Sequence, residues 1–177
     1  ALYEGRLDRG SADCHCLLTT DTLLGRRCAE LLRDFLRGQG LTVLDPVAPR
    51  GLSAASADAF RDGMKALIAW CEQSIPGYRN DGYNIVFNLS AGFKSLQGYL
   101  NIVGMFYADT IGYIFETSTE LVTIPRLPLR IDTDALRPGA ALLAMMAHDH
   151  LAKESEVQTL PEALFDIADF EGQALAA

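Results

Sequence analysis

Residues 83–109, with the sequence YNIVFNLSAGFKSLQGYLNIVGMFYAD, decide the fold. Residues 83–89 are nearly all apolar and rich in β-branched and aromatic side chains, which predicts a strand buried on both faces of a parallel sheet. Ser90, Ala91 and Gly92 are small and allow a sharp turn. Apolar residues then recur at helical spacing, namely Phe93, Leu96, Leu100, Val103 and Phe106 or Tyr107. The stretch therefore predicts a strand, a turn and a helix.

The start of this expected helix is a candidate anion site. A helix that begins just past a strand points its free N–H groups and the positive end of its dipole into the crevice where open α/β sheets bind ligands. Lys94 lies in the first turn, where its charge opposes the dipole by ~0.3–1 kcal/mol. A bound anion would compensate that charge. Spacing alone leaves a second interpretation open, in which Lys94 is a solvated surface lysine.

Strand and helix patterns alternate on both sides of this stretch, which predicts an α/β fold with a mainly parallel sheet. We expect strands at residues 14–20, 41–47, 110–115 and 121–124, and helices at 23–38 and at about 54–74, the latter ended by Pro76 and Gly77. Thr20, Asp21 or Thr22 is the expected cap of the first helix. The inward side chains expected on the second helix are Ala59, Met64, Leu67, Ile68 and Cys71. Only polar residues, 116–120, separate the last two strands, so a hairpin would give the sheet an antiparallel edge.

The pattern changes after Asp132 and becomes helical, with helices expected at residues 140–151 and 160–167. Pro161 suits the first position of the second of these helices. We therefore expect residues 1–132 to form the α/β domain and residues 133–177 to form a helical appendage, or a linker to an effector domain that this sequence does not include. The first of these helices is rich in Ala and Leu, so it packs on the sheet or takes part in a dimer contact.

Composition excludes several classes of partner. The chain has 177 residues, of which 49% are hydrophobic and 21% charged, as in an ordinary soluble α/β protein. A formal net charge of −8 argues against a surface for long nucleic acids, although it leaves room for a local basic pocket around a small anion. No apolar run could span a bilayer, and because charges at Glu4, Arg6, Asp8 and Arg9 interrupt any apolar stretch, we do not expect a signal peptide at the N-terminus. We expect a cytoplasmic protein with no membrane partner.

The four cysteines predict no metal site and no disulfide framework. Their spacing includes no CxxC pair, and the expected state is buried free thiols at Cys14, Cys16, Cys28 and Cys71. A zinc site built from Cys14, Cys16, His148 and His150 would not have the usual ligand spacing, so we expect no metal. His15 alternates with two cysteines and is expected on a polar or partly buried strand face rather than in a catalytic dyad.

The chain lacks the sequence motifs of several common cofactor and catalytic sites. The chain lacks GxGxxG after its first strand, GxxxxGK[ST], GxSxG and HExxH, which argues against a dinucleotide cofactor, a P-loop, a hydrolase elbow and a zincin site. We expect no cofactor. The remaining candidate ligand-binding residues are Asn88, Ser90, Ala91, Gly92, Phe93, Lys94 and Ser95, with Thr19, Thr20, Asp21 and Thr22 nearby if the two strands are neighbours in the sheet. Arg50, in the loop after the second strand, could also reach an anion.

Several separated segments resemble one family of CRISPR-associated Rossmann-fold (CARF) proteins. The run NLSAGFKSLQGYLNIVGMFYADTIGYIFETSTELVTIPRLPLRID is similar to that family's NLTGGFK, YLTLLGMLYAD, YIFE and IPRLP pattern. LLTTDTLLGRRCAELLRDFL looks like its strand, SDT-type turn and following helix. The resemblance covers roughly residues 14–132. It implies a Rossmann-like three-layer sandwich and a homodimeric sensor of CRISPR type III antiviral signalling.

The same resemblance implies a ligand. Family members bind a cyclic oligoadenylate, most often cyclic tetra-adenylate, across the two-fold axis at the carboxyl ends of their strands. Some members, the ring nucleases, cleave this ligand without a metal. Such cleavage would use the ribose 2′-hydroxyl as nucleophile and would give Lys94, with the backbone N–H groups from Ser90 to Phe93, the role of stabilising the phosphate. A mononucleotide- or phosphometabolite-binding domain is the interpretation that does not depend on the resemblance.

Two departures from the family pattern are visible. The family usually opens with another strand that ends in a GTS-type turn, and residues 1–13 do not predict such a strand. We expect that strand to be missing here. Ala91 stands where the family often has glycine.

Overall fold

A computed structural model of the chain describes residues 3, 6–90, 94–115, 120–130, 134, 137–149, 151–157, 169–171 and 174–176. The side chains of Lys94 and Ser95 are outside this description, as are those of a few other residues in helices and strands. The chain divides into two compact units, Ala1–Leu129 and Arg130–Ala177.

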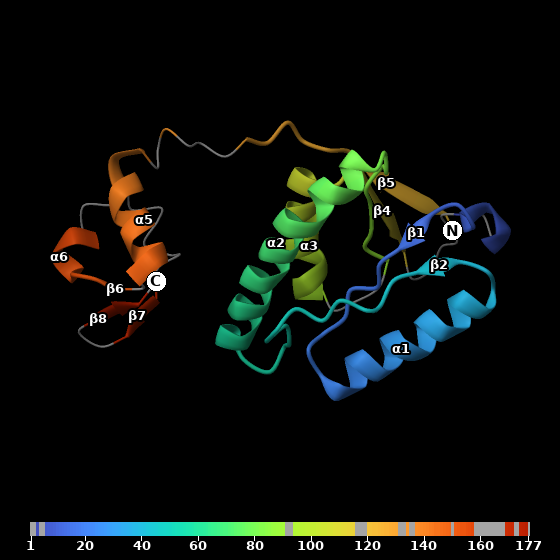
Figure 1. Cartoon of the computed structure of the whole chain (residues 1–177), viewed down its shortest axis with the longest axis horizontal. Coiled ribbons are helices and arrows are strands. Elements are labelled where there is room, and N and C mark those ends of the chain that lie inside the picture. Colours follow the sequence, from blue (N-terminus) through green and yellow to red (C-terminus); the bar gives the residue numbers. More distant parts are fainter. Residues whose placement is uncertain are drawn as a thin grey trace. The chain divides into compact units, whose positions relative to one another are not determined.

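The first unit is α/β, as predicted, and its sheets are small and mixed (Figure 1). It opens with a short 3-10 helix, η1 (Leu7–Gly10). One sheet pairs β1 (Cys14–His15) with β2 (Thr42–Val43) in parallel. The other has the order β3 (Val86–Asn88), β4 (Thr110–Ile114) and β5 (Leu121–Ile124), with β3 parallel and β5 antiparallel to β4. The predicted antiparallel edge is therefore confirmed, whereas the described strands form two separate sheets instead of one. Residues 116–119, between β4 and β5, lie outside the described residues.

The first two strands are shorter than the sequence predicts. Their ladder stops at His15 and Val43 and resumes only as a single parallel bridge between Leu18 and Val47. Pro46 lies in the interruption, and proline has no N–H to donate to a ladder. The chains stay together beyond it, because the Thr19 N–H donates to the Val47 carbonyl at 2.9 Å.

The prediction that β3 is buried on both faces is wrong. Val86 and Asn88 are exposed, whereas Phe87 between them is partly buried against the core. Exposure alternates because only the face of β3 that carries Phe87 packs on the core, which is the pattern of a half-buried strand.

Three helices complete the first unit: α1 (Leu23–Gly38), α2 (Ala57–Asn80) and α3 (Lys94–Tyr107). Thr22 caps α1, with its hydroxyl accepting the Gly25 N–H at 3.0 Å, so a cap among the three predicted residues is confirmed. The helix start that Lys94 marks is also confirmed. The apolar residues whose spacing predicts α1 are mostly exposed: Leu23, Leu24, Cys28, Leu31, Leu32 and Phe35. Only Ala29 of α1 is fully buried, because the helix rests on its own unit through small side chains.

The end predicted for α2 is wrong, because the helix continues through Pro76 to Asn80. A proline inside a helix costs about 3 kcal/mol. Tertiary contacts offset this cost here. Ile75 is buried in the core, and Arg79 donates to the Asp109 carboxylate at 2.9 Å and to the Tyr107 carbonyl at 2.9 Å.

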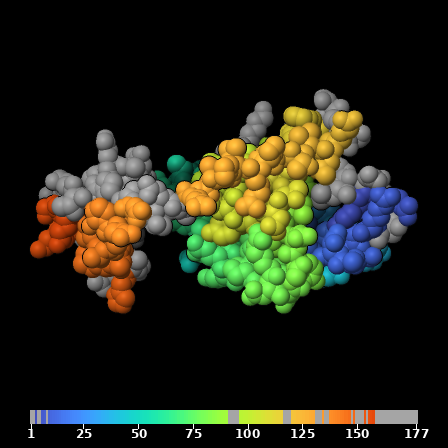
Figure 2. Space-filling view, turned by 90° about the horizontal axis from the view of Figure 1, so that it is seen from above, coloured from blue at the N-terminus to red at the C-terminus, as the bar shows by residue number. Residues whose placement is uncertain are grey.

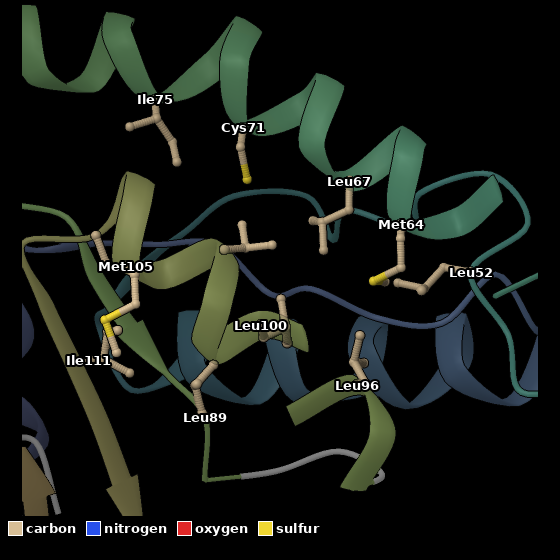
Figure 3. Packing of buried hydrophobic residues seen from close by; sticks show 12 residues of the cluster. Leu52, Met64, Leu67, Cys71, Ile75, Leu89, Leu96, Leu100, Met105 and Ile111 are labelled. Carbon is tan, nitrogen blue, oxygen red and sulfur yellow. The ribbon is translucent and has the colours of Figure 1, made fainter. Parts of the chain in front are cut away.

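The core lies between α2, α3 and the sheet (Figure 3). Leu67, Cys71 and Ile75 of α2 point toward the side chains of α3 and of Ile111 in β4. Met64, Leu67 and Cys71 are buried as predicted, and Ala59 and Ile68 are partly buried. In the space-filling view of Figure 2 the segments from α2 to β5, in green to gold, form one continuous packed body. Buried free thiols are confirmed only for Cys71, since Cys14 is half-buried and Cys16 and Cys28 are exposed.

The second unit contains η2 (Arg137–Gly139), α5 (Ala140–Asp149), β6 (Leu151–Ala152), α6 (Glu154–Val157), β7 (Asp169–Glu171) and β8 (Ala174–Ala176). The strands pair antiparallel in the order β6, β8, β7. The prediction of a helix starting at Ala140 is confirmed, and the one at residues 160–167 lies outside the described residues. A purely helical pattern missed the three strands, because strands of two or three residues are too short to show a period. Across the described parts of both units, no helix is long and apolar enough to cross a membrane.

Gly63 gives a direct test of how closely α2 packs. A Cβ added at Gly63 would lie 2.6 Å from the Leu52 backbone nitrogen, whereas one at Gly77 would meet nothing within 4 Å. We expect Gly63→Ala to lower the free energy of unfolding by roughly 1–3 kcal/mol, the cost of overpacking. The control Gly77→Ala on the same helix should raise it by about 0.5–1 kcal/mol. Urea denaturation measures both, and equal effects would contradict the packing described.

Candidate functional site

The first turn, made of Thr19, Thr20, Asp21 and Thr22, leads into α1. The hydroxyl oxygens of Thr20 and Thr22 lie 3.0 Å apart, and the Thr22 oxygen also accepts the Gly25 N–H. One of the two hydroxyl protons is used between the threonines, whichever of them donates. The pair therefore keeps one O–H to donate to a ligand.

Gly25 lets these hydroxyls approach the helix. A Cβ at Gly25 would lie 2.9 Å from the Thr19 hydroxyl oxygen, 3.0 Å from the Thr20 carbonyl oxygen and closer still to the Thr20 hydroxyl. Thr19 and Thr20 therefore lie against the N-terminal helical turn of α1, where Gly25 is located. Helix N-termini favour negative charge, so this placement suits a phosphate.

Asp21 fastens the first turn to the loop after β2. Its carboxylate accepts the Gly51 N–H at 2.8 Å and the Arg26 guanidinium at 3.1 Å, and its own N–H donates to the Leu52 carbonyl at 2.7 Å. The Gly51 N–H, with Arg26 and Arg50, holds the pKa of Asp21 below its ordinary value. The role of Arg50 as a residue that reaches an anion stays a prediction, although its charge acts on Asp21. Asp21 is occupied by these contacts, which makes it a residue that holds the turn in shape.

The second turn, residues 88–95, leads from β3 into α3. The Asn88 side-chain oxygen accepts the Ser90 N–H at 3.2 Å and the Ser90 hydroxyl at 2.6 Å. The Gln97 amide donates to the Leu89 carbonyl at 3.2 Å and ties α3 to the end of β3. Because Ser90 gives its proton to Asn88, its oxygen is left as an acceptor.

Part of the second turn stays a prediction. Ala91, Gly92 and Phe93 lie outside the described residues, and only the backbone of Lys94 and Ser95 is described. Lys94 is the first residue of α3.

Both turns lie in the first unit, but the strands that precede them, β1 and β3, are not neighbours in one sheet. Among the described strands, β1 and β3 fall in separate sheets, so the condition on which the sequence placed the turns together is not met. Leu18 and Leu89, which precede the two turns, nevertheless pack against the same hydrophobic core.

A small hollow beside α1 is lined, apart from Thr19, by residues that the sequence did not suggest as candidates. Its volume is about 210 Å³, and its lining is Thr19, Arg26, Glu30, Arg33, Asp45, Pro46 and Ala48. The spacing of seven between Arg26 and Arg33 was the available signal. Both arginines are neutralised by neighbours, Arg26 by Asp21 and Arg33 by Asp34 and Asp45, so the hollow adds no net positive charge.

The described residues hold no group of three or more His, Cys, Asp or Glu side chains suited to a metal. Of the four ligands considered from the sequence, His150 lies outside the described residues, and the cysteines and His148 belong to different units. His15 is partly buried, as predicted. Its ring nitrogens lie 2.7 Å from the Tyr3 hydroxyl and 3.0 Å from the Thr42 carbonyl oxygen.

Comparison with family models matches residues 2–127 to the family described as CRISPR-associated protein (Cas_APE2256). The chain belongs to this CRISPR-associated family. The match includes both turns and nearly all of the first unit. No curated protein matches the chain.

In this Cas_APE2256 family member, the YAD and IPRLP segments meet at Asp109. The Asp109 carboxylate accepts the Ile85 N–H at 2.8 Å and Arg79 at 2.9 Å, and Arg126 approaches it to 4.0 Å. Arg126 also donates to the Met105 carbonyl at 3.1 Å. The Ile85 N–H, followed by the two arginines, holds the pKa of Asp109 below its ordinary value. These segments therefore fasten β3, α3 and the residues after β5 to one another.

Asp109→Asn should lower the free energy of unfolding at pH 7 by roughly 1–2 kcal/mol, because it removes charge-assisted hydrogen bonds from a carboxylate that is 30% exposed. Since the folded pKa lies below the ordinary 3.8, the stabilisation by Asp109 is present above that pH and is lost as the pH falls through the folded pKa. The difference from wild type should thus shrink in acid. Denaturation from pH 7 to pH 3 measures it, with Asp81→Asn at the exposed end of α2 as the neutral control.

Proposed function

We propose that this CRISPR-associated protein is a CARF sensor that binds a cyclic oligoadenylate, with cyclic tetra-adenylate as the first ligand to test, in type III antiviral signalling. Residues 1–132 are then a Rossmann-like CARF domain, and residues 133–177 are an appendage or linker. The observation that carries the proposal is the first turn, where three threonines gather at the N-terminus of a helix that follows a parallel strand. Family membership and the resemblance of separated motifs support it.

A small polyanion with its own symmetry suits such a chain. Two copies related by a two-fold axis would present the same turns to opposite phosphates of one ring. Helix N-termini, hydroxyls and one lysine per copy are sufficient for that ligand and need no basic surface, which agrees with a net charge of −8.

The hydrogen-bonding capacity of the two turns favours a ribonucleotide. The Thr20 and Thr22 pair retains an O–H that can donate to a phosphate oxygen. The Ser90 oxygen, whose proton goes to Asn88, is an acceptor for a ribose 2′-hydroxyl. Lys94 and the N–H groups of the second turn would bind the phosphate oxygens.

A ring-nuclease activity is the second function that this arrangement supports. In that reaction the ribose 2′-oxygen attacks the adjacent phosphorus, the bond to the 5′-oxygen breaks, and the products end in a 2′,3′-cyclic phosphate and a 5′-hydroxyl. The 2′-oxygen loses its proton and the leaving 5′-oxygen gains one. An acceptor at Ser90 would orient the 2′-hydroxyl, and Lys94 would stabilise charge on the phosphate oxygens.

Incubation with cyclic tetra-adenylate, with and without EDTA, separates these functions. Binding without turnover identifies a sensor. Linear products formed in EDTA identify a ring nuclease. Absence of binding would overturn both and leave a mononucleotide- or phosphometabolite-binding domain.

Lys94→Ala should weaken binding or slow cleavage by roughly 1.5–3 kcal/mol, about 10- to 150-fold, because a charge-assisted hydrogen bond to phosphate is lost. Isothermal titration calorimetry measures the affinity. Lys65→Ala removes an exposed lysine from the middle of α2 and is the matched control. Equal affinities and rates for the Lys94 variant and wild type would refute the role given to Lys94.

The role of Ser90 is tested by a cycle of two proteins and two ligands. Wild type should bind the ribose ring more tightly than a ring with 2′-deoxyribose, by up to about tenfold for one hydrogen bond. Ser90→Ala should lose that preference while binding both rings. A preference that survives in the variant would show that another group recognises the 2′-hydroxyl.

A further inference from the structure

One face of α1 is apolar and points away from its own unit. Leu24, Leu31 and Phe35 are 75%, 60% and 59% exposed, and Cys28 between them is exposed too. These four residues, called the α1 stripe here, are spaced by four, three and four positions. In Figure 1, α1 lies along the lower margin of the first unit, with β2 above it. The stripe therefore has no covering partner among the described residues of its unit.

We propose that the α1 stripe binds the α1 stripe of a second copy of this chain, with the two helices antiparallel. A spacing of four, three and four is the seam by which two helices pack against each other. The stripe is also symmetric about its midpoint. In an antiparallel pair Leu24 faces Phe35 of the second copy, and Cys28 faces Leu31, so each large side chain in the middle of the seam meets a smaller one.

The charges beside the stripe favour this orientation. Arg27 and Asp34 lie on the same flank of the seam, seven residues apart. Antiparallel packing brings Arg27 next to Asp34 of the second copy, and does so twice because of the two-fold symmetry. Parallel packing would place Arg27 beside Leu32 and Asp34 beside Gln39, and would form no ion pair.

The ion pairs that Arg27 and Asp34 make within their own chain do not prevent them from pairing with the second copy. Arg27 contacts Glu30 at 2.9 Å in an exposed pair, and the Asp34 carboxylate, which is 62% exposed, contacts Arg33 at 2.9 Å, while Arg33 also pairs with Asp45. Exposed pairs of this kind contribute little to stability. The opposed dipoles of two antiparallel helices add a further favourable interaction.

The size of the stripe sets the strength of the contact. α1 has 16 residues and is about 24 Å long. A contact through one face of such a helix is at the small end of specific interfaces. The pair should therefore form and dissociate with protein concentration in the micromolar range.

This contact is separate from the two-fold axis of the proposed ring site. An antiparallel pair holds its two first turns at opposite ends, too far apart for one small ring. Changes in the stripe should thus alter assembly and leave the affinity for a cyclic oligoadenylate within twofold of wild type. If the protein does not bind a cyclic oligoadenylate, the proposed pairing of the α1 stripes is unaffected.

Sedimentation equilibrium of the whole chain tests the pairing. Leu31→Glu should raise the dimer dissociation constant by at least tenfold. Leu23→Glu is the matched control, because Leu23 is the most exposed leucine of α1, at 88%, yet lies outside the stripe. A wild-type chain that is monomeric at all concentrations, or a Leu31 variant that associates like wild type, would overturn the proposal.

Disulfide trapping tests the orientation with a conservative change. In a chain with Cys14→Ser and Cys16→Ser, Leu31→Cys should allow a disulfide to Cys28 of the second copy, with copper phenanthroline and oxygen taking up the two electrons and two protons. The linked dimer should disappear when Cys28→Ser is added. A dimer that links through Cys28 alone, without the Leu31 change, would identify parallel helices and overturn the antiparallel arrangement.

Discussion

The packing of α2 against α3 and the Leu52 loop is the constraint on which the rest of the first unit depends. Leu67, Cys71 and Ile75 fill the space between the two helices, and the absence of a side chain at Gly63 allows the Leu52 backbone to lie against α2. Leu18 and Leu89 rest on the same core just before the two candidate turns. The core thereby fixes both helix N-termini relative to the strands they follow. A ligand site built from backbone N–H groups and hydroxyls needs that rigidity, since it has few charged side chains to adjust.

Local sequence chemistry predicted the starts of the helices well. A threonine ahead of α1 and small residues ahead of α3 are interactions within a few positions, so the pattern contains all the information needed. The end of α2 was different. Pro76 predicts a stop, but Arg79 donates to Tyr107 and Asp109 and Ile75 is buried in the core, which no local pattern reveals, and the helix continues past the proline.

α1 shows the other limit of periodicity. Its spacing correctly predicted an amphipathic helix, but spacing does not say which face meets the domain. The helix turns Gly25 toward Thr19 and Thr20, buries Ala29, and leaves Leu24, Leu31 and Phe35 in solvent. Close approach of the first turn to the helix required small side chains, and this requirement decided the orientation.

For the candidate site, the sequence named the residue types and the structure assigned their hydrogen bonds. The structure shows that Asp21 connects the first turn to the loop after β2. The Thr20 and Thr22 pair keeps one O–H to donate, and the Ser90 oxygen can accept a hydrogen bond. Family membership establishes a CRISPR-associated protein, and the ligand is the step that binding must decide. The most direct measurement is the stoichiometry of cyclic tetra-adenylate binding by calorimetry. A ring bound across a two-fold axis should give one ring for every two chains, and either no binding or one ring for each chain would contradict such a site.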